Sequence, residues 1–291
     1  MVKLIDGKAY ADNLCQELKK QIAHFKEHHQ LVPGLAVVLA GDDEASQIYV
    51  ASKIRRAQEI GINIFTHFLP ASVAKDELID LIHRLNQDVN VHGILVQLPL
   101  PAPLPEHEVI NTIDAKKDVD GFTTYNIGLL NSWQDCLEPS TPQGALMLIK
   151  SVLGEDLSGK KAVVLGRSLI VGRPMASILV RESCTVTLLH SKSVNIEDEC
   201  KMADIIVSAI GKPGIIKASL VKSGACVIDI GITRVNGKLF GDVDFEDVSR
   251  VAGFITPVPG GVGPMTVACM LANTVKAMCI QQGVSFESKD N

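Results

Sequence analysis

Apolar and polar residues alternate in two different ways along the first 140 residues. Short, almost continuous apolar runs predict strands, and residues 35–40 and 93–98 are apolar enough to be buried on both faces of a sheet. A looser run at 62–68 predicts a third strand. Between the runs, apolar residues recur at helical spacing over 7–30, 44–60, 73–86 and 106–112. This alternation predicts a parallel sheet with helices on its faces.

The second half of the chain repeats the alternation with shorter strands. Apolar runs predict strands over 162–166, 185–189, 204–209 and 225–230. The first of them continues into a glycine turn and a helix over 175–182, an order that is typical of dinucleotide-binding folds. A last apolar helix is predicted from Pro264 to about Ile280. The predicted fold class is therefore α/β, with two α/β domains, the second of the Rossmann type.

The bulk composition limits the class of protein. The chain has 291 residues, which is enough for two domains with separate cores. Apolar residues make up 46% and charged residues 21%, as in folded globular proteins. The formal net charge of −5 argues against nucleic acid as the main partner, because a phosphate backbone requires a basic face.

Three features of the sequence predict a cytoplasmic protein. The seven cysteines are dispersed, without C-x-x-C pairs or the spacing of a zinc site, so we expect a reducing compartment and no metal site. The N-terminus is charged within three residues, so no signal peptide is expected. No apolar run approaches the ~20 residues of a membrane span, so no membrane association is expected.

The predicted helix at 44–60 carries the first candidate site. Asp42 or Asp43 can cap its first turn. Tyr49 and Lys53 lie one turn apart, on a stripe next to the one that faces the core. A phenol ring and an ammonium group in this arrangement can hold a flat heterocycle and still offer a proton donor. The alternative is a solvated lysine beside a half-buried tyrosine.

Polar side chains occupy two further positions near strand ends. Gln97 lies at the carboxyl end of the 93–98 strand, where parallel α/β sheets bind ligands, although a buried glutamine can also be a structural amide. Asp118 and Asp120 lie in the turn at 116–122. Aspartates in a turn commonly bond to their own backbone. The alternative is a carboxylate that accepts paired N–H groups from an aminopyrimidine-type ring.

The glycine turn after the 162–166 strand predicts a nucleotide site. Gly166 allows a tight bend, and Gly172 allows the next helix to approach closely, so that its N-terminus can face a pyrophosphate. Ser168 stands where the usual fingerprint has its second glycine, so the motif alone is weak. Its place between a strand and a helix strengthens it.

The segment after the 185–189 strand indicates which nucleotide binds. An NAD site places an acid there to hold the ribose 2′-hydroxyl, whereas a 2′-phosphate requires donors and positive charge. Residues 190–193 are His-Ser-Lys-Ser, and no acid occurs before Glu197. NADP is therefore the predicted cofactor, unless Lys192 is simply a solvated side chain. His190 is interpreted as a loop histidine, because nothing near it in the sequence would orient it as a catalyst.

Residues 256–264 combine three glycines with three prolines. Such a segment forms a rigid path with exposed N–H groups that can line a ligand. The alternative is a structural turn between two domains. Its length and composition favour a role in a site.

Five segments of the chain resemble one family, that of the bifunctional methylenetetrahydrofolate dehydrogenase/methenyltetrahydrofolate cyclohydrolases. Their order and spacing agree with the family over essentially the whole sequence. The segments are GDDEASQIYVASK at 41–53, GILVQLPLP at 93–101, KDVDG at 117–121, GRSLIVGRP at 166–174 and PVPGGVGPMT at 257–266.

The resemblance implies a two-step reaction in one cleft between the two α/β domains. NADP accepts a hydride from 5,10-methylenetetrahydrofolate, and water then converts the methenyl cation to 10-formyltetrahydrofolate. Residues 1–140 would form the folate-binding catalytic domain, completed by the C-terminal helix at 265–291. Residues 141–264 would form the NADP-binding domain. The resemblance also implies a homodimer.

The same resemblance assigns roles to individual residues. Lys53 would be the main cyclohydrolase residue, Gln97 would position it, Tyr49 would stack on the folate, and Asp120 would bind the pterin N–H groups. Further residues would line the folate pocket: Val96, Leu98, Pro259, Gly260, Gly261, Val262 and Gly263. The NADP-binding positions would be Gly166, Arg167, Ser168, Ser191 and Ile232.

Two other functions are compatible with parts of the sequence. A dehydrogenase of another small acid, shikimate-like, also combines a Rossmann domain with an active-site lysine. A non-catalytic folate-binding protein could be built on the same fold. Tyr49 with Lys53 and the glycine-rich segment at 259–263 argue against the first. The presence of Lys53, Gln97 and Asp120 with the glycine turn at Gly166 argues against the second.

Overall fold

The computed structural model describes residues 2–235 and 237–286, and the last residues of the predicted segment 265–291 lie outside this range. The chain forms two compact units. The three-stranded unit contains Asn13–Leu129, Gln134–Glu138 and the chain from Met270 onward. The six-stranded unit contains the chain up to Asp12, Leu130–Trp133 and Pro139–Cys269.

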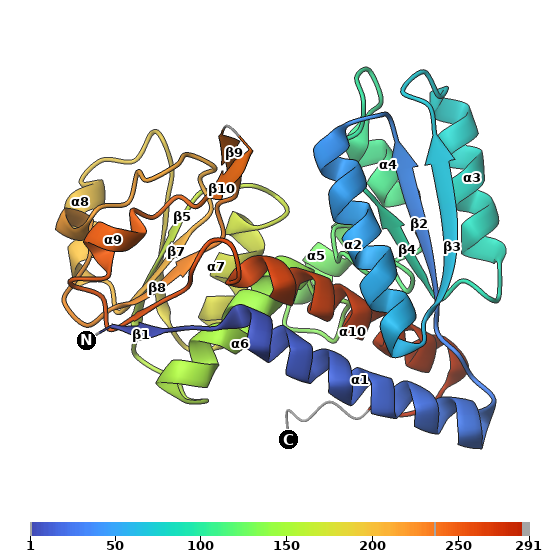
Figure 1. Ribbon diagram of the computed structural model, residues 1–291, viewed down its shortest axis with the longest axis horizontal. Helices are drawn as coiled ribbons and strands as arrows, with labels where there is room; N and C mark the ends of the chain where they lie inside the picture. The colour runs from blue at the N-terminus through green and yellow to red at the C-terminus, as the bar shows by residue number, and fades with distance from the viewer. Residues whose placement is uncertain (1, 236, 287–291) are drawn as a thin grey trace. The chain divides into compact units, whose positions relative to one another are not determined.

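The three-stranded unit is built around a parallel sheet in the order β3-β2-β4 (Figure 1). Its strands are β2 (Gly34–Ala40), β3 (Asn63–Leu69) and β4 (Gly93–Val96), and all of β2 and β4 is buried. The predicted strands and helices are therefore confirmed here to within a few residues. The helices are α1 (Gly7–His29), α2 (Glu44–Ile60), α3 (Lys75–Gln87), α4 (Glu106–Thr112) and α5 (Thr124–Asn131).

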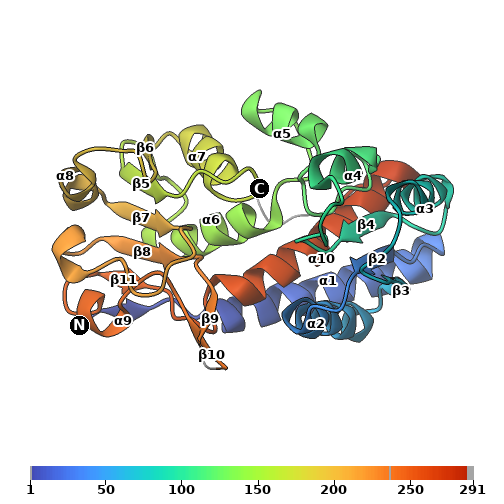
Figure 2. The ribbon, with the colours of Figure 1, turned by 90° about the horizontal axis from the view of Figure 1, so that it is seen from above.

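Hydrophobic packing divides the helices of this unit between the two faces of the sheet. Ala36 and Val38 of β2 share a core with Leu78 and Ile82 of α3 and with Val109 of α4. Helix α2 lies on the opposite face, as Figure 2 shows. Because side chains alternate along a strand, both faces of β2 must be apolar, which explains its uninterrupted hydrophobic sequence.

The six-stranded unit is a parallel sheet in the order β1-β11-β8-β7-β5-β6. Its strands are β1 (Lys3–Leu4), β5 (Lys161–Leu165), β6 (Thr185–Leu189), β7 (Ile205–Ser208), β8 (Cys226–Asp229) and β11 (Phe254–Ile255). The order reverses between β5 and β7, because β6 pairs with the other edge of β5. A reversal of this kind marks the ligand-binding position in Rossmann-type sheets.

Helices and a small hairpin surround this sheet. They are α6 (Ser140–Leu153), α7 (Gly172–Arg181), α8 (Ile196–Met202), η1 (Ala218–Leu220), the antiparallel pair β9 (Thr233–Val235) and β10 (Lys238–Phe240), and α9 (Phe245–Val248). The predicted helix at 175–182 thus begins three residues earlier, at Gly172. The short elements β1, β11 and α9 were not predicted, because two to four residues give too little periodicity, and α5 and α8 were not predicted either.

The compact units differ from the predicted domain boundaries at the N-terminus. The prediction places residues 1–12 with the first domain, whereas Lys3 and Leu4 pair with Phe254 and Ile255 in the six-stranded sheet. The division into a folate domain and an NADP domain concerns function and stays a prediction, as does the cleft between them.

Helix α10 (Val262–Gln282) begins in the six-stranded unit, and its residues from Met270 belong to the three-stranded unit. By length and composition it is apolar enough to cross a membrane, so the expectation that no apolar run approaches the length of a membrane span is wrong. However, 72% of its apolar window is buried inside the structure, as in the core helix of a globular protein. Its polar residues Asn273 and Thr274 are buried too.

Candidate active site

Helix α2 places Tyr49 and Lys53 through well-defined ends. The Asp43 carboxylate accepts the backbone N–H of Ser46 at 2.8 Å, as one of the two predicted caps, and Gly61 ends the helix with a left-handed φ of 96°. Between these ends Val50, Lys53 and Ala57 lie on the buried face of the helix, so the side chain of Lys53 points inward. Only 5% of Lys53 is exposed.

The buried ammonium group of Lys53 has two neighbours. Its Nζ donates a hydrogen bond to Oε1 of Gln97 at 3.1 Å and lies 4.6 Å from the centroid of the Tyr49 ring. The interpretation of Lys53 as a solvated lysine is therefore wrong. Burial lowers the pKa of Lys53, and the negative charge of Asp120 opposes this shift. The lysine is thus closer to a neutral, basic state than a surface lysine is.

Gln97 reaches Lys53 because of its position just after β4. Its backbone N–H donates to the carbonyl of Val38 at 2.9 Å, which continues the sheet ladder by one residue. Its side-chain Nε2 donates to the carbonyl of Leu98, so the amide is oriented with its oxygen toward Lys53. The Leu98–Pro99 peptide bond is cis.

The neighbours of Gln97 face the other way. Val96 is 1% exposed and belongs to the hydrophobic core that β4 shares with α3 and α4, and Leu98 packs against the same core. Side chains alternate along an extended chain, so Val96 and Leu98 point away from the face that carries Gln97. Their predicted place in the folate pocket stays a prediction.

The two aspartates of the 116–122 turn have different surroundings. Asp118 is 1% exposed, and its carboxylate accepts the backbone N–H groups of Phe122 at 3.2 Å and Thr123 at 2.8 Å. It also accepts a side-chain N–H from Asn126 at 3.0 Å. Asp118 is therefore the residue that organises the turn, as the turn-chemistry interpretation predicts.

Asp120 is partly exposed and faces the charge of Lys53. Among the described residues, no group donates a hydrogen bond to its carboxylate. Burial raises the pKa of Asp120 to about 6, the Lys53 ammonium lowers it, and the charge of Asp118 raises it. The same burial, together with the Asp120 charge, raises the pKa of the Tyr49 phenol. Because no described group donates to it, the Asp120 carboxylate is available to a ligand that carries N–H donors.

Helix α10 holds the turn that carries Asp120. The side-chain Nδ2 of Asn273 donates to the carbonyl of Val119 at 2.9 Å and to the carbonyl of Glu138 at 2.8 Å. The turn also packs closely on β4, since a Cβ added at Gly93 would lie 2.4 Å from Cγ1 of Val119. Residues from distant parts of the sequence thus fix the turn that carries Asp120.

The predicted nucleotide positions lie in the six-stranded unit, where β5 passes into the turn before α7. Gly166 has a φ of 111°, and a Cβ there would lie 2.3 Å from the carbonyl oxygen of Ala209. A Cβ at Gly172 would lie 2.0 Å from the carbonyl oxygen of Gly166. Both glycines are therefore required by close backbone contacts, as the sequence predicts.

The remaining predicted cofactor residues are exposed near the ends of the same strands. Arg167 and Ser168 follow β5, Ser191 follows β6, and Ile232, which is 54% exposed, follows β8. Ser168 also holds the turn before α7, because its Oγ accepts the N–H groups of Val171 and Gly172, each at 3.2 Å.

The turn after β6 suits the 2′-phosphate of NADP better than the ribose 2′-hydroxyl of NAD. Its residues 190–193 contain the exposed Ser191 and Lys192 and no acid. His190 accepts the backbone N–H of Lys192 through Nδ1 at 3.1 Å, and its own N–H donates to Oγ of Ser193 at 3.0 Å. His190 is therefore a loop histidine, as predicted. Together with Arg167, these donors and cations fit a 2′-phosphorylated dinucleotide.

The segment Pro259–Gly263 belongs to the six-stranded unit and has a clear structural role. The carbonyl of Gly260, a residue with a φ of 100°, accepts the N–H of Lys8 at 2.9 Å. A Cβ at Gly7 would lie 2.0 Å from the carbonyl oxygen of Gly261. The segment therefore anchors the start of α1, and its predicted contact with folate stays a prediction.

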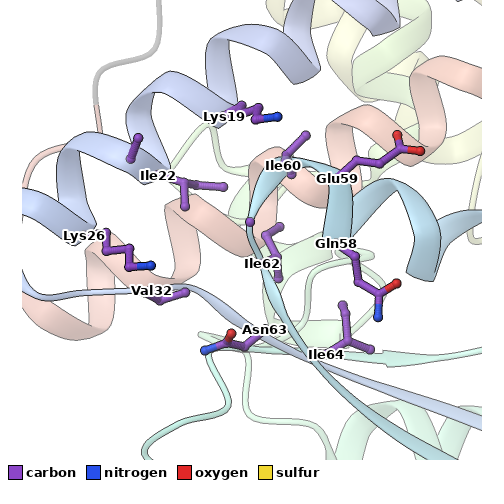
Figure 3. Close-up of a pocket in the computed structure, with 12 residues that line it drawn as sticks. Lys19, Ile22, Lys26, Val32, Gln58, Glu59, Ile60, Ile62, Asn63 and Ile64 are labelled. Atoms are coloured by element: carbon purple, nitrogen blue, oxygen red, sulfur yellow. The ribbon is translucent and has the colours of Figure 1, made fainter.

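A hollow on the surface of the three-stranded unit lies elsewhere. It is lined by residues of α1, the end of α2 and the start of β3, among them Lys19, Ile22 and Ile62 (Figure 3). None of the predicted site residues lines it.

Comparison with known proteins decides the family. The model of the tetrahydrofolate dehydrogenase/cyclohydrolase catalytic domain matches residues 5–120, and the model of the NAD(P)-binding domain of the same enzymes matches residues 139–282. The chain belongs to the tetrahydrofolate dehydrogenase/cyclohydrolase family. The bifunctional protein FolD 2 of Paracoccus denitrificans is 53% identical over 285 residues, which cover 97% of this chain and 94% of that protein.

Solved structures of this tetrahydrofolate dehydrogenase/cyclohydrolase family agree. The bifunctional enzyme FolD from Campylobacter jejuni superimposes with a TM-score of 0.94 at 43% identity, covering 97% of this chain and 100% of that one. The FolD enzyme from Trypanosoma brucei, solved with NADP and an inhibitor, gives 0.92 at 36% identity and covers 97% and 98%. The predicted family, α/β fold with a Rossmann-type domain, bifunctional activity and NADP cofactor are thereby confirmed.

Two residues of the site were missed from the sequence. Asp118 was not among the predicted site residues, although its three hydrogen bonds shape the turn that presents Asp120. Asn273 was included in a generally apolar helix. A buried asparagine amid apolar residues is itself a signal, because its amide must find partners.

Proposed function

We propose that this chain oxidises 5,10-methylenetetrahydrofolate to the 5,10-methenyl cation and hydrolyses that cation to 10-formyltetrahydrofolate, with Tyr49, Lys53, Gln97 and Asp120 as the residues that act on folate. The observation that carries the proposal is the buried Lys53–Gln97 pair beside Tyr49, with the Asp120 carboxylate near enough for its charge to act on Lys53. The family provides both activities.

In the oxidation step the protein mainly holds the substrate. The Tyr49 ring offers a face for the folate, and the Asp120 carboxylate accepts N–H groups of the pterin. Bound NADP supplies the chemistry by accepting a hydride from the methylene carbon. Fixing the two reactants relative to each other contributes much of the rate, and neither a metal nor a strong acid is needed.

In the hydrolysis step Lys53 handles the proton of water. Water adds to the methenyl carbon and loses one proton, and opening of the ring gives the 10-formyl product. Burial lowers the pKa of Lys53, so its neutral form is more accessible than that of a surface lysine, and this form can accept the proton. The cationic substrate lowers the pKa further, because two positive charges in one site repel each other. The Gln97 oxygen fixes Lys53 in position.

The cofactor would be held by the exposed residues at the strand ends of the six-stranded unit. Gly166 and the hydrogen bonds of the Ser168 hydroxyl would shape the turn that faces the pyrophosphate. Arg167 and Ser191 offer a cation and a hydroxyl to the 2′-phosphate. Ile232 offers an exposed apolar surface after β8.

We also propose that the enzyme is a cytoplasmic homodimer. Its seven cysteines are buried and spread over both units, which suits a reducing compartment. A second copy would cover the edge of β3, where Phe68 is 63% exposed.

A spectroscopic assay tests the proposed function. The chain is mixed with methylenetetrahydrofolate and either NADP or NAD, and the absorbance of the methenyl product is followed as it forms and decays. We expect formation with NADP at a much higher kcat/KM than with NAD, followed by decay to the formyl product. Binding of folate without any turnover would instead indicate a non-catalytic binding protein.

A further inference from the structure

A buried carboxylate organises the loop that follows β7 in the six-stranded unit. Asp242 is 0% exposed. Its Oδ2 accepts the hydroxyl of Ser208 at 2.9 Å and the backbone N–H of Ile210 at 2.7 Å. Its Oδ1 accepts the backbone N–H of Lys212 at 2.8 Å. Both oxygens are therefore used, and two of the three donors are main-chain groups of one loop.

The loop at 209–214 lies where this sheet is built to bind a ligand. Strand β7 neighbours β5, and the strand order reverses between them, so the loops after these two strands flank the nucleotide position. The two loops also touch, since a Cβ at Gly166 would lie 2.3 Å from the carbonyl oxygen of Ala209. A shift of the 209–214 loop would therefore reach the turn at Gly166.

A second buried aspartate holds the segment that carries Asp242. The Asp229 carboxylate, 3% exposed, accepts the backbone N–H of Asp242 at 3.0 Å and of Val243 at 2.9 Å. It also accepts the N–H of Gly231 at 3.0 Å, at the start of the loop that leads to Ile232. The two carboxylates thus tie together the chain after β7, the chain after β8 and the segment before α9.

Two glycines allow the main chain to approach the carboxylates of Asp242 and Asp229 closely. A Cβ at Gly231 would lie 2.1 Å from Oδ1 of Asp242, and a Cβ at Gly241 would lie 1.9 Å from Oδ2 of Asp229. Any residue with a Cβ at these two positions would clash with an aspartate carboxylate, so the close approach requires glycine. Such packing fixes the carboxylates as firmly as their hydrogen bonds do.

We propose that Asp242 is a positioning residue for the dinucleotide: it does not touch the cofactor, but it fixes the 209–214 loop as one wall of the binding position. The proposal rests on the proposed function, because it assigns the loop to the NADP site of that enzyme. A purely structural aspartate would hold buried strands together, whereas the 209–214 loop that Asp242 holds lies outside the buried sheet. Ile210 is partly exposed, and Gly211, Lys212 and Pro213 are exposed.

The test compares Asp242→Asn with Asp244→Asn in the full-length protein. An asparagine has one acceptor oxygen, and its NH₂ group would face a backbone N–H, so one side of the loop loses its partner. Asp244 caps α9 by accepting the N–H of Asp247 at 3.2 Å and pairs with Lys217, so its variant is a matched acid-to-amide change outside the loop. The readouts are the Kd of NADP, measured by fluorescence titration, and the rate of amide hydrogen exchange at residues 210 and 212.

We expect Asp242→Asn to raise the Kd and KM of NADP by about tenfold or more, as for loss of a charge-assisted hydrogen bond, while kcat at saturating NADP changes much less. Exchange at residues 210 and 212 should become faster, and Asp244→Asn should change neither readout. If Asp242→Asn folds and binds NADP as the parent does, or if kcat and affinity fall together with the folded fraction, the proposal is overturned.

A second variant decides the case in which Asp242→Asn does not fold. Ser208→Ala removes one of the three partners and leaves both backbone bonds to Asp242. A smaller but clear rise in the Kd of NADP supports the proposal, and an unchanged Kd overturns it. Failure of the parent protein to bind NADP would instead overturn the proposed function, so the two failures are distinguishable.

Discussion

At the scale of single residues, burial separates side chains that the sequence leaves equivalent. Asp118 and Asp120 are two positions apart, yet the Asp118 carboxylate accepts backbone N–H groups of the turn, whereas the Asp120 carboxylate remains available to a ligand. Lys53 could be identified as a candidate from the sequence. Its burial could not, because it depends on Gln97, which lies 44 residues further along the chain. Contacts of this range are fixed by the sheet and not by local pattern.

The first prediction concerns Lys53. In Lys53→Met the side chain keeps its bulk but can no longer exchange a proton, so we expect cyclohydrolase activity to fall by roughly 10²–10⁴-fold, the usual contribution of a general base. Part of the dehydrogenase activity should remain, since hydride transfer does not require this proton. Both rates are measured from the absorbance of the methenyl intermediate. Full hydrolysis by the variant would refute the assignment.

The second prediction concerns Asp120 and the pH dependence. In Asp120→Asn the KM for folate should rise roughly ten- to hundredfold in both activities, because a charged acceptor is lost. The Asp120 charge raises the pKa of Lys53, so its removal should lower that pKa further. The basic form of Lys53 would then be present at lower pH, and the rising limb of the cyclohydrolase pH profile should move to lower pH. Unchanged KM values and an unmoved limb would contradict both roles.

At the scale of secondary structure, long elements follow from the sequence and short ones do not. The bounds of α2 agree with the predicted helix at both ends, because Asp43 and Gly61 give local signals there. Strands β1 and β11 have two residues each, and they exist only because the sheet offers them a partner. The same distinction holds for the site: α2 was predictable, whereas the support that α10 gives to the Asp120 turn was not.

The third prediction concerns that support. Asn273→Ala leaves the carbonyls of Val119 and Glu138 without this donor, so the free energy of unfolding should fall by about 1–3 kcal/mol. Because the loosened turn carries Asp120, the KM for folate should rise more than kcat falls. Thr274→Val is the control, since among the described residues the Thr274 hydroxyl donates to the Met270 carbonyl of its own helix. Chemical denaturation and steady-state kinetics provide the two measurements. Equal effects of both variants on KM would argue against the role of Asn273.

At the scale of the whole molecule, the two sheets differ in the length of their edge strands. In the six-stranded unit the short strands β1 and β6 form the edges, whereas in the three-stranded unit one edge is the seven-residue strand β3. A long edge strand with unpaired backbone groups and an exposed aromatic side chain favours association with another chain. In a homodimer, the second copy would cover this edge.

The last prediction is therefore about oligomeric state. Sedimentation velocity should give a mass of twice the 31.3 kDa of one chain. Phe68→Glu places a charge on the β3 edge and should shift the equilibrium toward monomer, because burying that charge on association is costly. Val89→Glu is the matched control: Val89 is 78% exposed in the same unit but lies in the loop after α3. If both variants stay dimeric, the edge of β3 is not the interface, and a monomeric parent protein would refute the homodimer itself.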